Sequence, residues 1–362
     1  MTNDDLRSQR PSTSLGGMKA SLAAEILALQ KTRMTKQSGD GVSFAFPSTE
    51  TLANALDPLF EVKETSLSRI ARREFNLYTS SCPSEIVACR LDDNRVVRLL
   101  CKYEIAFDRS AYGHRGGLEY EAEVYRSVIQ TSEVAAGPGF LGIFRDQVSG
   151  AYCLVIEYLD NAVWLSRSTD ADAMERTARW LGRFHAELVH RFVSPSMSCL
   201  TSYSRAYYHG WVQRTLQILS EIKYVKPWLN TVAAGFHELI NQLLESPPTV
   251  IHGEFYPHNV LVRSDGIYPV DWETAALGPG EIDLASLTEG WPPEVVRECE
   301  QQYCKERWSN GGPPAGWRAT LDTARLYWLF RWLGDRPRWA AAEKSLTRLD
   351  SLEGLGRRLG LI

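Results

Sequence analysis

The apolar pattern of the chain changes near residue 160, and this change restricts the possible folds more than any other feature of the sequence. Between residues 74 and 159 the apolar residues occur in short runs rich in β-branched and aromatic side chains, which predict strands. From residue 170 onward they recur mainly at helical spacing. The chain is therefore expected to be a two-lobed α+β protein, with a small β-rich N-terminal lobe and a larger, mainly helical C-terminal lobe.

The N-terminal lobe is expected to contain a small sheet with one helix laid across it. Strands are expected at residues 74–80, 85–91, 95–103, 140–144 and 152–159. The turn signal Asp92–Asn94 between two of these runs predicts a β-hairpin. Residues 116–130 carry apolar side chains at helical spacing and predict the helix.

Three segments follow from this pattern: a tail with a short helical pattern (1–45), the β-rich lobe (46–158) and the helical lobe (159–362). Within the helical lobe, residues 170–192 begin with acidic and end with basic side chains, as the helix dipole favours. A ligand is expected in the cleft between the two lobes.

The composition, 44% hydrophobic and 23% charged, is that of an ordinary soluble globular protein. A formal net charge of -4 gives no global attraction to nucleic acid or to an anionic membrane, so neither is expected as a partner. Seven scattered cysteines without a CxxC pair predict neither a disulfide framework nor a zinc site, and they favour the cytoplasm. The oligomeric state is not readable from the sequence.

The segment VIHGEFYPHNVLV (250–262), followed by GIYPVDWETA (266–275), carries the strongest chemical signal. Two apolar runs flank the turn Arg263–Gly266, so a hairpin is expected. The hairpin places the loop before its first strand close to the residue after its second strand. Glu254, Asn259 and Asp271 are therefore expected to converge.

Carboxylate and amide oxygens of this kind suit a hard cation. Magnesium takes one or two carboxylates or carbonyls and completes its octahedron with waters and substrate phosphates. Phosphoryl transfer needs such a site, because its catalysis is mostly positioning and charge neutralisation. The alternative is an ordinary hairpin whose loop ends are polar.

Two charged residues ahead of this motif fit the same chemistry. Lys102 ends an apolar strand run, where a lysine facing a cleft can bind nucleotide phosphates. Glu121 lies on the next expected helix and can hold that lysine by an ion pair. Each residue alone is better explained as a solvated surface charge, but their order and spacing ahead of Asn259 and Asp271 make coincidence a poor explanation.

Taken together, these motifs resemble a known family. Lys102, Glu121, the inter-lobe stretch VIEYL, HGEFYPHN, and VDWE with IDLA are similar to the aminoglycoside phosphotransferase family, relatives of choline kinase in the protein-kinase-like superfamily. The resemblance spans roughly residues 70 to 335. It implies a protein-kinase-like fold, the use of ATP or GTP with Mg²⁺, and phosphorylation of a hydroxyl on a small molecule such as an aminoglycoside, an amino sugar or a choline-like alcohol.

The resemblance also implies which residues bind the nucleotide. Lys102 would contact its phosphates with Glu121 as partner, and Glu157 and Tyr158 would lie beside it between the lobes.

One departure concerns the loop between the first two strands, TSSCPSE, which lacks the glycines with which protein kinases cover the phosphates. Hydroxyls or backbone amides of Ser80 and Ser81 are expected to contact phosphate in their place.

In the C-terminal lobe, the resemblance implies metal ligands and structural residues. Asn259 and Asp271 would be magnesium ligands, and Glu273 would add an outer contact to the metal. His252 and Asp283 would brace the catalytic loop.

Glu254 stands where the family normally has an aspartate that orients the acceptor hydroxyl. Aspartate and glutamate have nearly the same acidity, so what changes is reach, by one methylene. A catalytic carboxylate misplaced by about 1 Å can lower the rate on the order of 100-fold. In a loose transition state, however, this carboxylate needs only to orient the acceptor hydroxyl. An active kinase is expected, and the alternative is a nucleotide-binding pseudokinase with a scaffold or regulatory role. A protein kinase is less well supported, because no long activation loop or APE-like segment follows VDW.

The acceptor is expected to bind in the helical lobe. The candidate residues are Glu289, Trp291, Tyr327 and Arg331, with Trp328 and Asp335 beside them. Carboxylates with aromatic faces suit a cationic or sugar-like acceptor. The same aromatics are equally explained as core residues at helical spacing, and the sequence does not name the acceptor.

Overall fold

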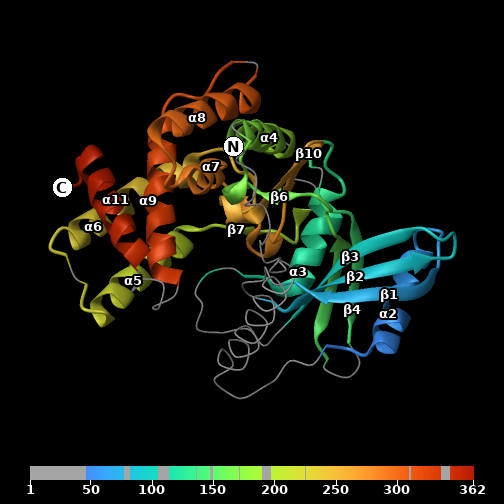
Figure 1. The fold of residues 1–362 in the computed structure, drawn as a ribbon. Coiled ribbons are helices and arrows are strands. Elements are labelled where there is room, and N and C mark those ends of the chain that lie inside the picture. Colours follow the sequence, from blue (N-terminus) through green and yellow to red (C-terminus); the bar gives the residue numbers. More distant parts are fainter. Residues whose placement is uncertain are drawn as a thin grey trace, which may run out of the picture.

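A computed structural model describes residues 46–76, 82–104, 113, 115–135, 137–146, 150–170, 172–189, 197–224, 226–309, 311–335 and 343–362. An antiparallel sheet with its helices lies beside a larger helical part that ends in the C-terminal helices (Figure 1). The predicted two-lobed α+β architecture is confirmed. The short helical pattern expected within residues 1–45 lies outside the described residues.

The sheet of the N-terminal lobe has five strands in the order β1-β2-β3-β5-β4, all paired antiparallel. The strands are β1 (Leu67–Phe75), β2 (Ser84–Leu91), β3 (Val96–Tyr103), β4 (Phe140–Arg145) and β5 (Tyr152–Glu157). The strand expected at residues 74–80 overlaps β1 at Glu74 and Phe75, since β1 begins earlier, at Leu67, and residues 77–80 lie outside the described residues. β1 is an edge strand without a buried residue, so its sequence lacks the alternation of apolar and polar residues from which a strand is predicted.

Two helices cover opposite faces of this sheet. α2 (Thr49–Glu61), capped by the Ser48 side chain, shares a core with Leu99 and Cys101 of β3. α3 (Gly117–Val124) continues as a π-helical turn and packs on the other face, so a helix is present where one was expected. Because side chains alternate along a strand, Lys102 of β3 points away from α2 and toward α3.

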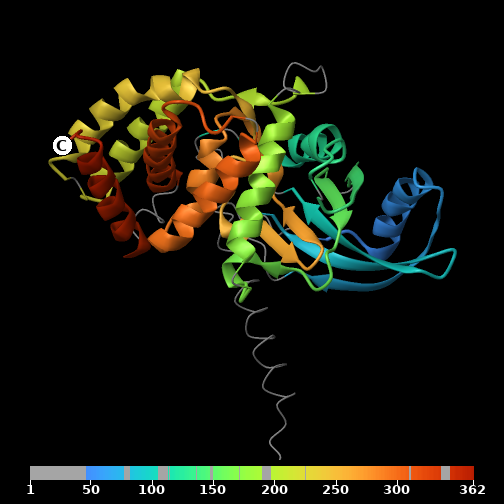
Figure 2. The same ribbon diagram turned by 90° about the horizontal axis from the view of Figure 1, so that it is seen from above.

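The helical lobe is built mainly from long helices, with the short and fully buried α7 among them, around a core that continues into the α3 face of the sheet. Its helices are α4 (Ala173–Leu188), α5 (Arg205–Glu221), α6 (Leu229–Glu245), α7 (Glu281–Thr288), α8 (Pro293–Arg307), α9 (Trp317–Asp335) and α11 (Glu343–Arg358). Seen from above, α2 and the red C-terminal helices lie at opposite ends of the molecule (Figure 2). No helix within the described ranges is long and apolar enough to cross a bilayer.

Two small three-stranded sheets lie in the helical lobe. One has the order β10-β9-β6 and the other β7-β11-β8. Their strands are β6 (Val163–Trp164), β7 (Thr201–Ser202), β8 (Thr249–Ile251), β9 (Val260–Arg263), β10 (Gly266–Pro269) and β11 (Ala276–Gly278). The chain from β8 to β11 contains the whole segment that carries the predicted chemistry.

Candidate active site

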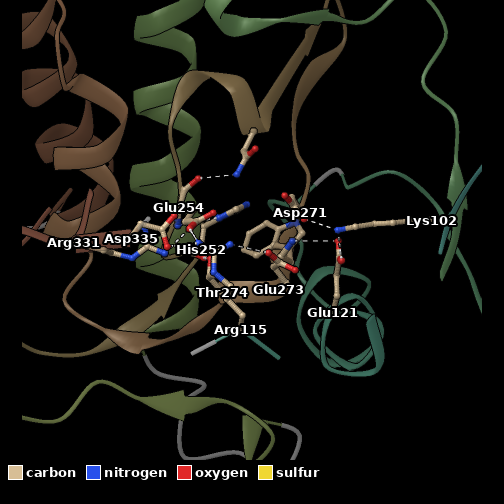
Figure 3. Close-up of polar contacts among 12 residues, drawn as sticks. Lys102, Arg115, Glu121, His252, Glu254, Asp271, Glu273, Thr274, Arg331 and Asp335 are labelled. Carbon is tan, nitrogen blue, oxygen red and sulfur yellow. Dashed lines mark hydrogen bonds and ion pairs between the residues drawn. The ribbon is translucent and has the colours of Figure 1, made fainter. Parts of the chain in front are cut away.

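Lys102 joins the two lobes at the centre of the site. Its Nζ donates to Glu121 Oε2 at 2.8 Å and to Asp271 Oδ1 at 2.5 Å (Figure 3). Burial opposes the positive charge, but Asp271 and Glu121 raise the pKa of Lys102 well above its ordinary value, so the side chain is an ammonium at neutral pH. The structure thus brings together the lysine, the glutamate and the aspartate that the sequence analysis singled out.

Helix α3 is fastened to the segment that follows β10. Glu121 Oε1 accepts a hydrogen bond from Trp272 N at 3.3 Å, and Gly116 N donates to Glu273 O at 2.9 Å. These contacts hold the helix of one lobe against the acidic segment of the other.

The hairpin β9–β10 brings Asn259 and Asp271 to the same end. Val262 pairs with Ile267 across the turn, as predicted, and Val270 N donates to Asn259 O at 2.9 Å. Asp271 then leaves the hairpin with a φ of 70°, a left-handed conformation that aspartate adopts more readily than most residues.

Asn259, Asp271 and Glu273 offer oxygen atoms of the kind that magnesium takes. Asn259 Nδ2 donates to Glu254 O at 3.2 Å, which leaves the amide oxygen for another partner. Glu273 Oε2 is buried and has no hydrogen-bond partner among the described residues. Burial, followed by repulsion from Asp271, raises the pKa of Glu273 to about 7, and a nearby cation favours the ionised carboxylate.

The described residues contain no group of three or more His, Cys, Asp and Glu side chains arranged for a metal. Magnesium does not require one, because waters and substrate phosphates supply most of its ligands. Two carboxylates, one of them with an unpaired buried oxygen, and an amide oxygen therefore fit this ion.

Asp283 of α7 braces the loop that carries Glu254. Its buried carboxylate accepts hydrogen bonds from His252 N at 2.7 Å and from Gly253 N at 2.9 Å. His252 Nε2 donates to Val270 O at 3.0 Å, while its Nδ1 accepts from Glu254 N at 3.3 Å. Gly253 has a φ of 81°, which favours glycine. Asp283 and His252 thus lie where a bracing role requires them.

A second buried histidine contacts the same aspartate. His185 of α4 donates from Nε2 to Asp283 Oδ2 at 3.3 Å and accepts at Nδ1 from the Tyr303 hydroxyl at 3.0 Å. Burial lowers the pKa of His185 to about 4, so its imidazole is neutral at physiological pH.

We expect His185 to make the stability of the protein depend on pH. Because its folded pKa of about 4 lies below the ordinary 6.5, the unfolded chain binds the proton first as the pH falls. The stabilisation is complete above about pH 6.5 and decreases toward pH 4, by about 3 kcal/mol. Chemical denaturation at several pH values should show a shallower pH dependence for His185→Gln, with His258→Gln at an exposed position as the control. An unchanged slope in His185→Gln would contradict this prediction.

Two arginines hold the carboxylate of Glu254. Its Oε1 accepts from Arg331 Nη2 and, at 3.1 Å, from Arg115 Nη2. Burial opposes ionisation, yet these arginines lower the pKa of Glu254 to about 2. Figure 3 shows Arg331 and Asp335 on the side of Glu254 opposite Lys102. Arg331, which was predicted to contact the acceptor, thus contacts the candidate catalytic carboxylate.

Arg115 was not predicted from the sequence. Its guanidinium contacts Glu254 Oε1 at 3.1 Å, Asp335 Oδ1 at 3.1 Å and Glu273 Oε1 at 3.2 Å. All three partners are distant along the chain, and Arg115 belongs to no motif. The two glycines after it were a local sign of close backbone approach, and the amide of Gly116 does contact Glu273.

Glu157 and Tyr158 lie where β5 leaves the sheet for the helical lobe. Glu157 Oε2 accepts from Gly139 N at 3.1 Å, and the Arg98 guanidinium lies 4.4 Å from the centre of the Tyr158 ring. Both contacts are with residues of the N-terminal lobe. Ser80 and Ser81 lie outside the described residues.

Three of the predicted acceptor residues have structural partners. Tyr327 is fully buried, with its hydroxyl 3.1 Å from that of Tyr207. Glu289 pairs with Arg348 of α11 at 2.7 Å, and Trp291 is half-buried against the core. The explanation that these are packing residues is thus at least as well supported as a role in acceptor binding.

The family described as "Phosphotransferase enzyme family" matches residues 93–346, more than half of the chain. The chain belongs to this family. Membership supports phosphotransferase chemistry on a small molecule. A curated relative, a LicA homolog from Mycoplasma capricolum subsp. capricolum, is 26% identical over 91 residues, which are 25% of this chain and 35% of that protein. The chain therefore matches about a third of that relative's length.

Solved structures of this family's fold are similar over most of the chain. Choline kinase from Cryptosporidium parvum Iowa II has a TM-score of 0.61 at 13% identity and covers 87% of this chain and 98% of its own. Aminoglycoside 2'-phosphotransferase-IIIa, in its GDP complex, has a TM-score of 0.58 at 12% identity and covers 86% and 99%. A choline/ethanolamine kinase family protein from Mesorhizobium loti has a TM-score of 0.55 at 16% identity and covers 91% and 95%. The expected protein-kinase-like fold is confirmed.

Proposed function

We propose that this phosphotransferase-family chain transfers the terminal phosphoryl group of ATP or GTP, with Mg²⁺, to a hydroxyl of a small molecule. The observation that carries the proposal is the contact of Lys102 with both Glu121 and Asp271. An ammonium held between two carboxylates, where the sheet meets the hairpin, suits phosphate oxygens beside a metal. The acceptor class is an aminoglycoside, another amino sugar, a choline-like alcohol or a related metabolite.

Each side chain of the site has a distinct role in this proposal. Asp271, Asn259 and Glu273 would hold magnesium, which supplies neutralisation of phosphate charge when bound. Lys102 would bind phosphate oxygens. Glu254 would orient the acceptor hydroxyl, whose oxygen forms the new bond to phosphorus as the bond to the bridging oxygen of the nucleotide breaks. The nucleoside diphosphate leaves with the electron pair of that bond, and the hydroxyl proton is released to solvent. Its pKa of about 2 suits a hydrogen-bond acceptor more than a base that retains a proton.

The second candidate function is a nucleotide-binding pseudokinase. The contact of Glu254 with Arg331 and Arg115 favours it, because two guanidinium groups compete with an acceptor hydroxyl for the carboxylate. Such a protein would bind nucleotide and act as a scaffold or regulator without turnover.

The decisive experiment is a screen of nucleotide consumption with Mg·ATP and Mg·GTP over aminoglycosides, amino sugars, amino alcohols and nucleosides. Mass spectrometry should find one product that has gained a phosphoryl group. Nucleotide binding by calorimetry without any product would favour the pseudokinase, and the absence of binding would exclude both candidates.

We further propose a cytoplasmic location, with a nucleotide and a small-molecule acceptor as the partners. The seven cysteines are free thiols in the structure, which supports a reducing compartment. Neither nucleic acid nor a membrane is proposed as a partner.

A further inference from the structure

The carboxylate of Glu254 is held through one oxygen only. Both Arg331 Nη2 and Arg115 Nη2 donate to Oε1. Oε2 makes no hydrogen bond with the described residues and is not among their fully buried unpaired atoms. One oxygen is therefore fixed, while the other remains able to accept a hydrogen bond from a ligand.

Arg331 itself has little freedom to move. Its side chain is 4% exposed and projects from α9. The guanidinium carbon lies 5.3 Å from the ring centre of Trp211 and 5.4 Å from that of Trp328. Two cation–π contacts and a long helix thus define where the guanidinium meets Glu254.

Arg115 approaches the same oxygen from the other lobe. It is held by Asp335 at 3.1 Å and by Glu273 at 3.2 Å, and the backbone next to it is tied to Glu273 through Gly116 N. Arg115 therefore links Glu254 to the segment that carries Asp271.

A glutamate has one more rotatable bond than an aspartate, so an unrestrained Glu254 would place its carboxylate less reproducibly. We infer that Arg331 and Arg115 are positioning residues, and that their joint hold on Oε1 keeps Oε2 toward the acceptor hydroxyl. This inference rests on the proposed phosphotransferase function. The competing explanation is that the arginines only neutralise a buried charge, in which case they affect stability alone.

The first measurement uses water as the acceptor, so that no acceptor need be known. Arg331→Met should lower kcat for Mg·ATP hydrolysis about 10- to 100-fold, because a shift of the carboxylate by about 1 Å costs that much. The Kd for Mg·ADP should change less than about twofold in Arg331→Met, since among the described residues Arg331 pairs with Glu254 and not with Lys102, Asp271 or Glu273. Arg331→Lys should restore part of the rate. The matched control is Arg325→Met, which removes an arginine of the same helix paired with Glu300 at 2.5 Å; it should change neither value.

The second measurement separates positioning from a purely structural effect. In a Glu254→Ala background, Arg331→Met should lower the residual rate no further, because no carboxylate remains to be positioned. If that residual rate is too small to measure, Glu254→Asp serves as the second background, because its shorter side chain withdraws the carboxylate from both arginines and Arg331→Met should again lower the rate no further. Thermal unfolding checks that each variant is folded. If Arg331→Met fails to fold, Arg115→Met replaces it in the rate comparison alone, because Arg115 also contacts Glu273 and its loss affects Mg·ADP binding.

The inference would be overturned if Arg331→Met lowered the hydrolysis rate by the same factor in the wild type and in the Glu254 variant. It would also be overturned if Arg331→Met lowered the rate of the wild type no more than Arg325→Met does. Either outcome leaves the proposed function intact, provided the wild type binds Mg·ADP and turns over Mg·ATP. A wild type that does not bind Mg·ADP would instead overturn the proposed function, and this inference with it.

Discussion

Asp271→Asn is expected to lower kcat by about 10³-fold, since it removes the carboxylate that faces both Lys102 and the proposed cation. Asparagine is nearly isosteric with aspartate and also tolerates the left-handed backbone observed at this position, where φ is 70°. A loss of activity would therefore report the lost charge and not a distorted hairpin.

The measurement is phosphoryl transfer at increasing magnesium concentration, together with calorimetry of nucleotide binding. Asp271→Asn should require more magnesium, while ADP binding without the metal changes little. Asp265→Asn, in the exposed turn of the same hairpin, is the matched control and should leave both quantities unchanged. A kcat within tenfold of wild type for Asp271→Asn would remove Asp271 from the proposed metal site.

The convergence of Asn259 and Asp271 could be predicted because a hairpin with a short turn fixes its own register. The approach of Lys102 to Glu121 could be predicted because a strand and the helix after it are adjacent, and the alternation along β3 decides which side chains face that helix. In both cases the information is local in sequence.

The arginines around Glu254 could not be predicted in the same way. Arg115 contacts Glu254 across 139 positions of sequence and Asp335 across 220, and no periodicity connects positions so distant. Arg331 lies on a helix whose buried positions include both aromatic and charged residues. Its position in the helical repeat therefore did not show which residue its guanidinium contacts. Only the packing of the two lobes reveals that both guanidinium groups reach one oxygen.

Glu254→Gln is expected to lower kcat by about 10²- to 10⁴-fold, although it keeps the size of the side chain. Its amide oxygen can still accept from Arg331 and Arg115 in place of Oε1. The amide nitrogen then occupies the position of Oε2 and presents donors, so it cannot accept a hydrogen bond from an acceptor hydroxyl. Nucleotide binding should be retained. Glu353→Gln on α11, where Glu353 pairs with Arg357 on the surface, is the control.

Glu254→Asp distinguishes the two candidate functions, because they predict opposite results. In an active kinase the shorter side chain withdraws the carboxylate from Arg331 and Arg115, so turnover falls by up to about 100-fold. In a pseudokinase the wild type is inactive, and the same withdrawal frees the carboxylate from two competing guanidinium groups, so turnover appears or rises. Turnover is measured with the acceptor that the screen identifies, or with water. A decrease in Glu254→Asp means that the arginines position Glu254 for catalysis, and an increase means that they block it.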